Sequence, residues 1–231
     1  MSKTHEKPFF RDALASSRST KFYKAIYAIK DKACQTKGIY LTTGVACAVN
    51  VQDETVEETT ASSISFVVTW NGVVGESNCN KPFILDRISR KKTQKQYRLS
   101  TSTVKTSGSF SFLTVQEVVG LKDNKTFKLK SLDIKALTPE EQTSDFKVYS
   151  ISGEEKLLEL QFKYKQVTKK HELEVPNTKD SPRNPSLVGS PIIIDEKFVV
   201  GVVGKTVTGQ LIPCFITRKE LGEYNALMLS F

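Results

Sequence analysis

The chain has 231 residues, of which 39% are hydrophobic, and 34 Lys and Arg against 25 Asp and Glu give a formal net charge of +9. This length allows one large all-β unit or two small domains, and no apolar run approaches the roughly eighteen residues that span a bilayer. The N-terminal segment is charged throughout and lacks the apolar core of a secretory signal, so we expect an intracellular protein, in the cytoplasm or nucleus, without membrane insertion.

Cysteine and histidine usage bears on the cellular compartment and on metal binding. The four cysteines lie far apart and include no Cys-x-x-Cys pair: Cys34, Cys47, Cys79 and Cys214. Without a secretory signal, free thiols are the expected state. Zinc sites use clustered Cys and His ligands, and the only histidines are His5 and His171. We therefore expect no metal and no cofactor.

The first half of the chain consists of short apolar segments. Residues 1–20 are polar and mostly aperiodic, and predict a flexible N-terminal arm. Apolar runs at Phe22–Lys30 and Ile39–Val49, separated by a polar connection, predict a hairpin. After an acidic loop, further strands are predicted at Ser63–Thr69, Phe83–Ile88, Gln96–Ser102, Ser109–Val118 and Thr126–Leu132.

The second half repeats this pattern and ends in a helix. The segment Leu137–Asp145 combines a proline with charges and no periodicity, and predicts a linker between the halves. Helical spacing occurs only from about Arg218 onward. Many short strands and one terminal helix predict an all-β barrel or sandwich. The later strands are expected in "FKVYSIS", "KLLELQFKYKQV", "HELEV", "SPIII", "KFVVGVV" and "QLIPCFI".

Four further segments carry a family resemblance. They are, in chain order, "TTGVACAV", "VVTWNGVV", "LDIKAL" and "SLVGSP" followed by "IIIDEKFVVGVVG". In this order, and with the terminal helix, they resemble the trypsin/chymotrypsin-like serine proteases over roughly Phe22 to Phe231. The resemblance implies an all-β fold, the double antiparallel β-barrel with a C-terminal helix. It divides the chain into the arm 1–20, a first barrel 21–137, a linker 138–147 and a second barrel with the helix, 148–231.

The resemblance also implies that the catalytic triad is degenerate. It assigns the positions of base, acid and nucleophile to Gly72, Asp133 and Val188. Glycine cannot accept a proton and valine cannot attack a carbonyl carbon. Loss of either the base or the nucleophile of such a triad costs on the order of a millionfold in turnover. Ser186 holds the oxyanion position, where the family has glycine, and Gly204 replaces a serine that supports the aspartate. We therefore expect a pseudoenzyme.

A protease fold that has lost its catalytic residues can still bind a partner. In the family, a substrate peptide pairs with an exposed strand edge, which the resemblance places at Gly204, Lys205, Thr206 and Val207. Strand addition takes its affinity from main-chain hydrogen bonds and needs no triad. The leading hypothesis is a catalytically inactive pseudoprotease that serves as an intracellular protein-interaction module, with a peptide in the cleft between the barrels. A filled or closed cleft is the competing expectation.

Two other functions remain open from the sequence. The first is nucleic-acid binding through a basic segment with an interleaved tyrosine, since such clusters contact phosphates non-specifically. Its basic residues are Arg87, Arg90, Lys91, Lys92, Lys95 and Arg98, and four further lysines lie between residues 163 and 170. Solvated hairpin tips would explain both clusters equally well. The second is an active hydrolase with a relocated site, built from Ser190, Cys47 or Cys214 with His171, although a histidine in a lysine-rich stretch is expected to be simply exposed.

Overall fold

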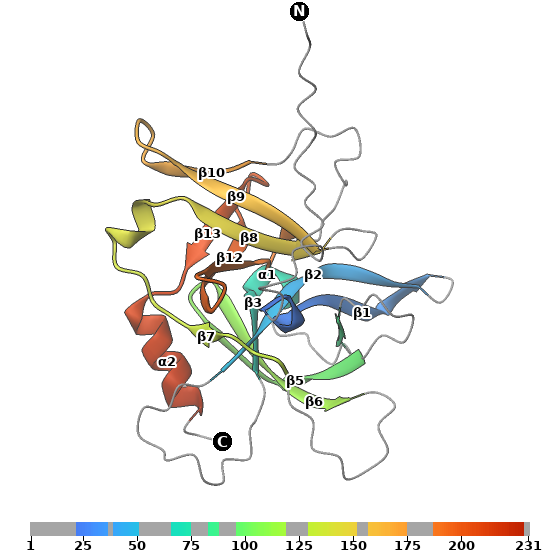
Figure 1. The fold of residues 1–231 in the computed structure, drawn as a ribbon. Coiled ribbons are helices and arrows are strands. Elements are labelled where there is room, and N and C mark those ends of the chain that lie inside the picture. Colours follow the sequence, from blue (N-terminus) through green and yellow to red (C-terminus); the bar gives the residue numbers. More distant parts are fainter. Residues whose placement is uncertain are drawn as a thin grey trace, which may run out of the picture.

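The computed structural model describes residues 22–36, 39–50, 66–74, 83–87, 96–118, 129–151, 157–174 and 187–228. Within these ranges the chain forms two sheets and a C-terminal helix (Figure 1). The first sheet is a closed antiparallel barrel with the strand order β1-β2-β3-β6-β5-β4. Its strands are β1 (Ile26–Thr36), β2 (Ile39–Val49), β3 (Phe66–Trp70), β4 (Phe83–Arg87), β5 (Gln96–Ser107) and β6 (Phe110–Val118).

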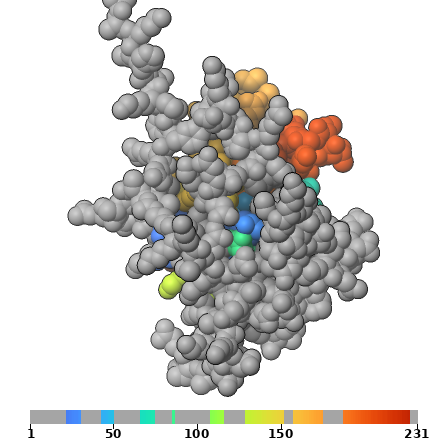
Figure 2. Space-filling model, turned by 90° about the vertical axis from the view of Figure 1, so that its right-hand side faces the viewer, coloured from blue at the N-terminus to red at the C-terminus, as the bar shows by residue number. Residues whose placement is uncertain are grey.

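The second sheet has the order β10-β9-β8-β11-β12-β13, and a short strand β7 pairs with β12 in parallel. This two-residue parallel pair departs from the wholly antiparallel arrangement that the resemblance implied. Its strands are β7 (Asp133–Ile134), β8 (Phe146–Ile151), β9 (Leu157–Lys165), β10 (Lys170–Glu174), β11 (Pro191–Ile194), β12 (Phe198–Lys205) and β13 (Leu211–Phe215). Figure 2 shows part of this half, in orange and red, from the side.

Aromatic packing brings the two outer strands of the second sheet together. The imidazole of His171 on β10 lies 5.4 Å from the ring of Phe215 on β13 and 5.0 Å from that of Tyr164. Its Nε2 lies 3.0 Å from the carbonyl oxygen of Ser144. The expectation that His171 is simply exposed is therefore wrong. Its ring belongs to the contact between β10 and β13, whose neighbourhood includes Phe146.

Most predicted strands are present, and two predicted segments differ. Phe22–Ala25 forms a 3₁₀ turn, η1, before β1 begins. This turn places the ring of Phe22 against Tyr149 of β8, with ring centroids 4.7 Å apart. Of the strand predicted at Thr126–Leu132, the first three residues lie outside the described ranges, and only Leu132 makes a bridge, to Val49. Leu132 bonds to Ala48 and Asn50, and Asp133, which follows it, pairs with β12.

The predicted linker is partly ordered into regular structure. It contains a second 3₁₀ turn, η2 (Glu141–Thr143), and β8 begins within it at Phe146. The terminal helix, α2 (Arg218–Met228), begins at the predicted residue. Thr217 and Glu220 cap it reciprocally, since the Thr217 N–H donates to Glu220 Oε2 over 2.9 Å and the Glu220 N–H donates to Thr217 Oγ1 over 3.3 Å.

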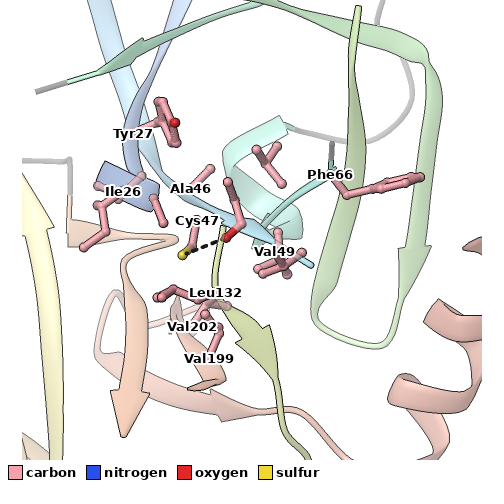
Figure 3. Close-up of a cluster of buried hydrophobic side chains, with 14 of the residues drawn as sticks. Ile26, Tyr27, Ala46, Cys47, Val49, Phe66, Leu132, Val199 and Val202 are labelled. Atoms are coloured by element: carbon pink, nitrogen blue, oxygen red, sulfur yellow. Dashed lines mark hydrogen bonds between the residues drawn. The ribbon is translucent and has the colours of Figure 1, made fainter. Parts of the chain in front are cut away.

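One hydrophobic core cluster spans both halves, and a second cluster lies within the second half. Buried side chains of the first barrel form a continuous cluster with residues of the second half, including Tyr149, Ile193 and Ile216. Figure 3 shows this meeting, with Ile26, Tyr27, Ala46, Cys47 and Val49 on one side and Leu132, Val199 and Val202 on the other. Helix α2 adds Tyr224, whose ring lies 4.7 Å from that of Phe112. The halves therefore form one packed unit.

The turn between β11 and β12 offers a direct test of backbone strain. Asp195 and Glu196 both have positive φ, 52° and 53°, the conformation of a hairpin turn that favours Asn-Gly or Asp-Gly. We expect Glu196→Gly to raise the free energy of unfolding by about 0.5–1 kcal/mol, because a side chain with a Cβ is strained in this region. Urea denaturation measures the change. Glu196→Ala is the matched control, because it removes the carboxylate but keeps the strain and should bring no gain. Equal effects of the two variants would contradict the explanation.

Candidate functional site

The candidate site lies where the halves meet, at the turn that precedes β11. The Val45 N–H of β2 donates to the carbonyl oxygen of Val188 over 2.9 Å. The hydroxyl of Thr69, on β3, donates to the carbonyl oxygen of Val45 over 2.7 Å. On the other side of the turn, the Gly189 N–H donates to Val203 on β12 over 2.7 Å. Main-chain hydrogen bonds therefore hold the Val188–Gly189 turn between β2 and β12.

Two glycines make this close approach possible. A Cβ on Gly44 would stand 2.6 Å from Val73 Cγ2 and 2.8 Å from the Val188 carbonyl oxygen, which is closer than real Cβ atoms come. Gly189 has φ +82°, and a Cβ there would overlap the Val45 carbonyl oxygen and the Thr69 hydroxyl. Neither position tolerates a larger residue without movement of the backbone.

Gly72 lies beside this turn, in the one-turn helix α1 (Asn71–Val74) that follows β3. The Asn71 N–H donates to the Ser109 carbonyl oxygen over 3.0 Å, and the Asn71 side chain donates to Gly108 and accepts from Ser111. The same turn carries Val73 against Gly44 and Gly189. The structure thus brings the Gly72 turn and the Val188 turn together.

The indole of Trp70 fills the space beside Gly72. A Cβ on Gly72 would overlap the six-membered ring of this indole. The Nε1 atom at the other end of the ring would stand 3.0 Å from a Cβ on Gly204, in β12. The ring therefore spans two glycines, one from each half, and is half-buried. Its only polar atom is an N–H donor, so it cannot serve as a base.

The thiol nearest to this cluster is that of Cys214, on β13. Its sulfur would lie 2.5 Å from a Cβ on Gly204. Burial raises the pKa of the Cys214 thiol, and the nearby Glu220 carboxylate raises it further. Hydrogen bonds with Ser109 and with the main chain of Gly204 act in the opposite direction and lower this pKa. The thiolate is the nucleophilic form of cysteine. Cys214 is thus held as a neutral thiol at neutral pH.

Asp133 is not part of this cluster, and its assignment as the triad acid is corrected. It pairs with Phe198, six residues before Gly204 on β12, and lies beside Asn50, five residues beyond Val45 on β2. At 3.2–3.4 Å per strand residue, these offsets put it roughly 15–20 Å from the Gly72–Val188 contact. Its carboxylate pairs with Lys197, 3.6 Å away, and accepts a hydrogen bond from Asn50. It balances local charge instead of orienting a base.

Sequence reasoning missed Ser109, which lies in the cluster around Gly72. Phe110, the first residue of β6, pairs with Trp70, so the residue before it, Ser109, reaches the cluster. Strand pairing would have indicated Ser109, because it directly precedes β6, the strand that lies beside β3. A serine hydroxyl at this place cannot hold an imidazole in one tautomer as a carboxylate does.

The predicted peptide-binding edge is shorter than expected. Gly204 pairs with Ile212, and the Thr206 N–H donates to the Gln210 carbonyl oxygen over 2.9 Å, so the main-chain groups of both face β13. Lys205 faces the opposite side, because successive residues alternate, and β11 no longer covers that side. Val207 lies beyond β12 in the exposed hairpin turn. Of the four predicted residues, only Lys205 has main-chain groups on an edge of β12 that no described strand covers, which we call the free edge.

The candidates for relocated catalysis do not assemble. The hydroxyl of Ser190 is fully buried and donates to Ser150 Oγ over 2.8 Å. Burial raises the pKa of the Cys47 thiol, which is also fully buried. Phe215, the residue after Cys214, meets His171, and successive side chains of a strand point to opposite faces. His171 and Cys214 therefore lie on opposite faces of β13.

The structure describes only part of the first basic cluster but all four lysines of the second. Arg87 ends β4 and Arg98 lies on β5, paired with Ile84. The other four, Arg90, Lys91, Lys92 and Lys95, lie outside the described residues, as does Ser186. In the second cluster, Lys163 pairs with Glu174 over 3.0 Å and Lys165 with Glu172 over 3.9 Å. Half of its lysines are thus neutralised across the β9–β10 hairpin.

The described residues offer neither a metal site nor a membrane-spanning helix. No cluster of three or more His, Cys, Asp or Glu side chains among these residues could hold a metal ion. No helix among them is long and apolar enough to cross a membrane. Cys47 and Cys214 are free thiols.

The junction can be tested with two glycine substitutions. We expect Gly189→Ala to lower the free energy of unfolding by about 2–4 kcal/mol, because the new methyl group combines positive-φ strain with overlap of Val45 and Thr69. Gly222→Ala in α2 is the matched control, since no atom lies within 4 Å of its Cβ position. It should raise stability by about 0.5–1 kcal/mol through helix propensity. Equal losses from both variants in chemical denaturation would refute the special role of the junction.

Comparison with known proteins identifies the fold. No protein-family model matches the sequence, and no curated protein matches it significantly. The solved MamO protease domain of Magnetospirillum magneticum is 10% identical, with a TM-score of 0.53 over 89% of this chain and 97% of that one. The structure of GrC is 11% identical, with a TM-score of 0.52 over 91% and 96% of the two chains. The protein therefore has the double-barrel fold of the trypsin-like serine proteases.

Proposed function

We propose that this protein is a catalytically inactive pseudoprotease that binds a protein partner. The observation that carries the proposal is the indole of Trp70, which lies over Gly72 where the side chain of a base would begin. With no imidazole at 72 and no hydroxyl at Val188, neither proton transfer nor nucleophilic attack has a group to perform it. The loss of both groups removes on the order of a millionfold or more in turnover.

The surroundings offer no replacement for these groups. Among the described residues, Cys214 is a neutral thiol beside a serine hydroxyl and an indole N–H, neither of which is a base, and the Glu220 carboxylate near it caps helix α2. Asp133 is engaged with Lys197 and Asn50. A nucleophile needs a base within hydrogen-bonding reach, and the base needs a group that orients it. Val188 is not a nucleophile, the groups described beside Cys214 do not act as a base, and Asp133 is not free to orient one.

The binding role is supported by what the fold retains. Lys205 presents an N–H and a carbonyl oxygen on the free edge of β12, and its side chain is exposed and positively charged. The adjoining turn carries Val207, which is fully exposed. One donor–acceptor pair contributes only about 1–2 kcal/mol, so a partner peptide must add side-chain contacts to bind firmly. An extended segment with an acidic residue near Lys205 fits this surface.

Nucleic-acid binding and an intracellular location remain predictions. The net charge of +9 favours the first. The Lys163–Glu174 and Lys165–Glu172 pairs weaken the contribution of the second basic cluster, so the Arg87–Arg98 segment would have to supply the phosphate contacts. The pseudoprotease proposal requires neither.

Absence of catalysis is the first consequence to measure. We expect no labelling by a fluorophosphonate probe and no cleavage of casein or activated esters. The Gly72→His/Val188→Ser variant should remain inactive as well, because Trp70 occupies the space of the imidazole and Asp133, the acid that the resemblance assigned, pairs with Lys197 instead. Active trypsin validates the assay. Labelling of the unmodified protein would overturn the proposal.

Binding at the free edge has its own test. Peptides are selected from a random phage-displayed library on the folded protein. We expect Lys205→Pro to weaken their binding about fivefold or more, because proline removes the N–H that faces the free edge. Lys205→Ala is the control, since it keeps the N–H while removing the charge, and a smaller loss is expected. Unchanged affinity of the proline variant, with its thermal stability retained, would show that the peptides bind elsewhere.

A further inference from the structure

Asn71 and Gly72 form the only Asn-Gly pair in the sequence. Asparagine is one of the thermolabile residues of proteins, because its carboxamide carbon can be attacked by the main-chain nitrogen of the next residue. Glycine exposes that nitrogen most, since it has no side chain to shield it. The pair begins helix α1, where Asn71 is half-buried and Gly72 is exposed to solvent. The turn at Gly72 therefore carries a reactive pair of residues.

The folded turn holds both polar atoms of the Asn71 carboxamide. Its Nδ2 donates to the Gly108 carbonyl oxygen over 2.6 Å, and its Oδ1 accepts from the Ser111 hydroxyl over 2.8 Å. The main-chain N–H of Asn71 also donates, to the carbonyl oxygen of Ser109 over 3.0 Å. Bringing Cγ of Asn71 onto the Gly72 nitrogen requires rotation of the side chain, which would give up both of its hydrogen bonds. The fold thus restrains the reactive group.

Packing keeps glycine at position 72. A Cβ there would overlap the indole of Trp70, so a residue that shields the nitrogen requires movement of this ring. The next residue, Val73, is buried, and its methyl groups lie against Gly44 and Gly189. The reactive pair is therefore tied to the junction between the halves, and its protection depends on the hydrogen bonds of Asn71.

We propose that Asn71–Gly72 is a site of spontaneous deamidation, which the folded turn suppresses and which disrupts the junction once it has occurred. The Gly72 nitrogen forms a bond to Cγ of Asn71, the Cγ–Nδ2 bond breaks, and ammonia leaves with the proton of the Gly72 nitrogen. Water then opens the cyclic imide at either carbonyl and gives aspartate or isoaspartate. The net reaction takes up water and releases ammonia, and it is independent of the proposed binding function.

Either product disturbs the turn. A carboxylate at position 71 cannot donate to the Gly108 carbonyl oxygen and brings a negative charge against it. Isoaspartate lengthens the main chain by a methylene group, so α1 no longer carries Val73 to its place against Gly44 and Gly189. A chain that stays unfolded long enough to react would lose the ability to rebuild the junction.

A comparison of folded and unfolded full-length protein tests the site. Both are incubated at neutral pH and the same temperature, the second in guanidinium chloride, and conversion of each asparagine is followed by peptide-resolved mass spectrometry. A synthetic peptide of residues 67–74, measured in both solutions, corrects for the denaturant. We expect Asn71 to convert before the other asparagines of the unfolded chain.

In the folded protein, conversion of Asn71 should be about twentyfold slower, because each of its two side-chain hydrogen bonds contributes a factor of about five. Equal corrected rates in the two states would overturn the proposal. So would conversion of Asn71 that is no faster than that of the other asparagines in the unfolded chain.

Ser111→Ala separates the local restraint from general stability. It removes the donor to Oδ1 of Asn71, and we expect conversion in the folded protein to accelerate about fivefold. Ile192→Val is the matched control, because it trims a fully buried side chain of the second barrel and lowers stability without touching Asn71. Denaturation gives the stability of both variants. Acceleration by both in proportion to their loss of stability would show that only global unfolding exposes the site, which contradicts the role of the turn.

Refolding tests the consequence of the reaction. After incubation in denaturant, the yield of refolded protein should fall in step with conversion of Asn71, because converted chains cannot rebuild the α1 turn. Asn71→Gln is the control, since its longer carboxamide forms a cyclic imide much more slowly, and its yield should stay constant over the same time. Recovery of converted wild-type chains in the folded fraction, with the denaturation midpoint of the unconverted protein, would refute the effect on the junction.

Discussion

The contact between the Val188–Gly189 turn and the Gly44–Val45 segment of β2 is the constraint on which the arrangement of the two halves depends. It joins the halves through the main chain, and it requires glycine at two positions because a Cβ at either would overlap backbone or side-chain atoms. Around it, the core of the first barrel continues into Val199, Val202 and Ile216 of the second half. Hydrophobic burial supplies most of the stability of such a unit, and the glycine contact sets the distance at which the halves pack.

This constraint explains how the fold persists without triad residues. The hydrogen bonds of the junction are made by the peptide groups of Val45, Val188 and Val203 and by the hydroxyl of Thr69. None of them uses the side chain at position 72 or 188. A valine at 188 is half-buried against the shared core and suits its surroundings better than a hydroxyl without a partner would. The residues that a protease needs for chemistry and those that this fold needs for packing are therefore largely separate sets.

The order and type of most elements could be predicted from the sequence, because alternation in strands such as Leu157–Lys165 and the helical spacing after Arg218 are local signals. The residues of the site could be predicted only where a local sequence pattern marks them, as at Gly72 and Val188. Asp133 was misassigned because its neighbours match the expected run, whereas its actual partners, Lys197 and Asn50, follow from long-range pairing. The same limit hid Ser109, which reaches the cluster through the pairing of Phe110 with Trp70. His171 seemed exposed because the sequence does not show that β10 and β13 meet.

Trp70 and the two glycines are best understood as one packing solution. A glycine at 72 leaves empty space beside the end of β3, and a glycine at 204 leaves space on the facing strand. An empty space between packed elements forfeits dispersion contacts, and water in an apolar gap finds few hydrogen-bond partners. The indole fills both spaces at once while its outer part stays in contact with solvent. Replacing the imidazole and filling the space beside Gly204 are thus consequences of the same substitution pattern, so a histidine at 72 requires the departure of Trp70 before any question of catalysis arises.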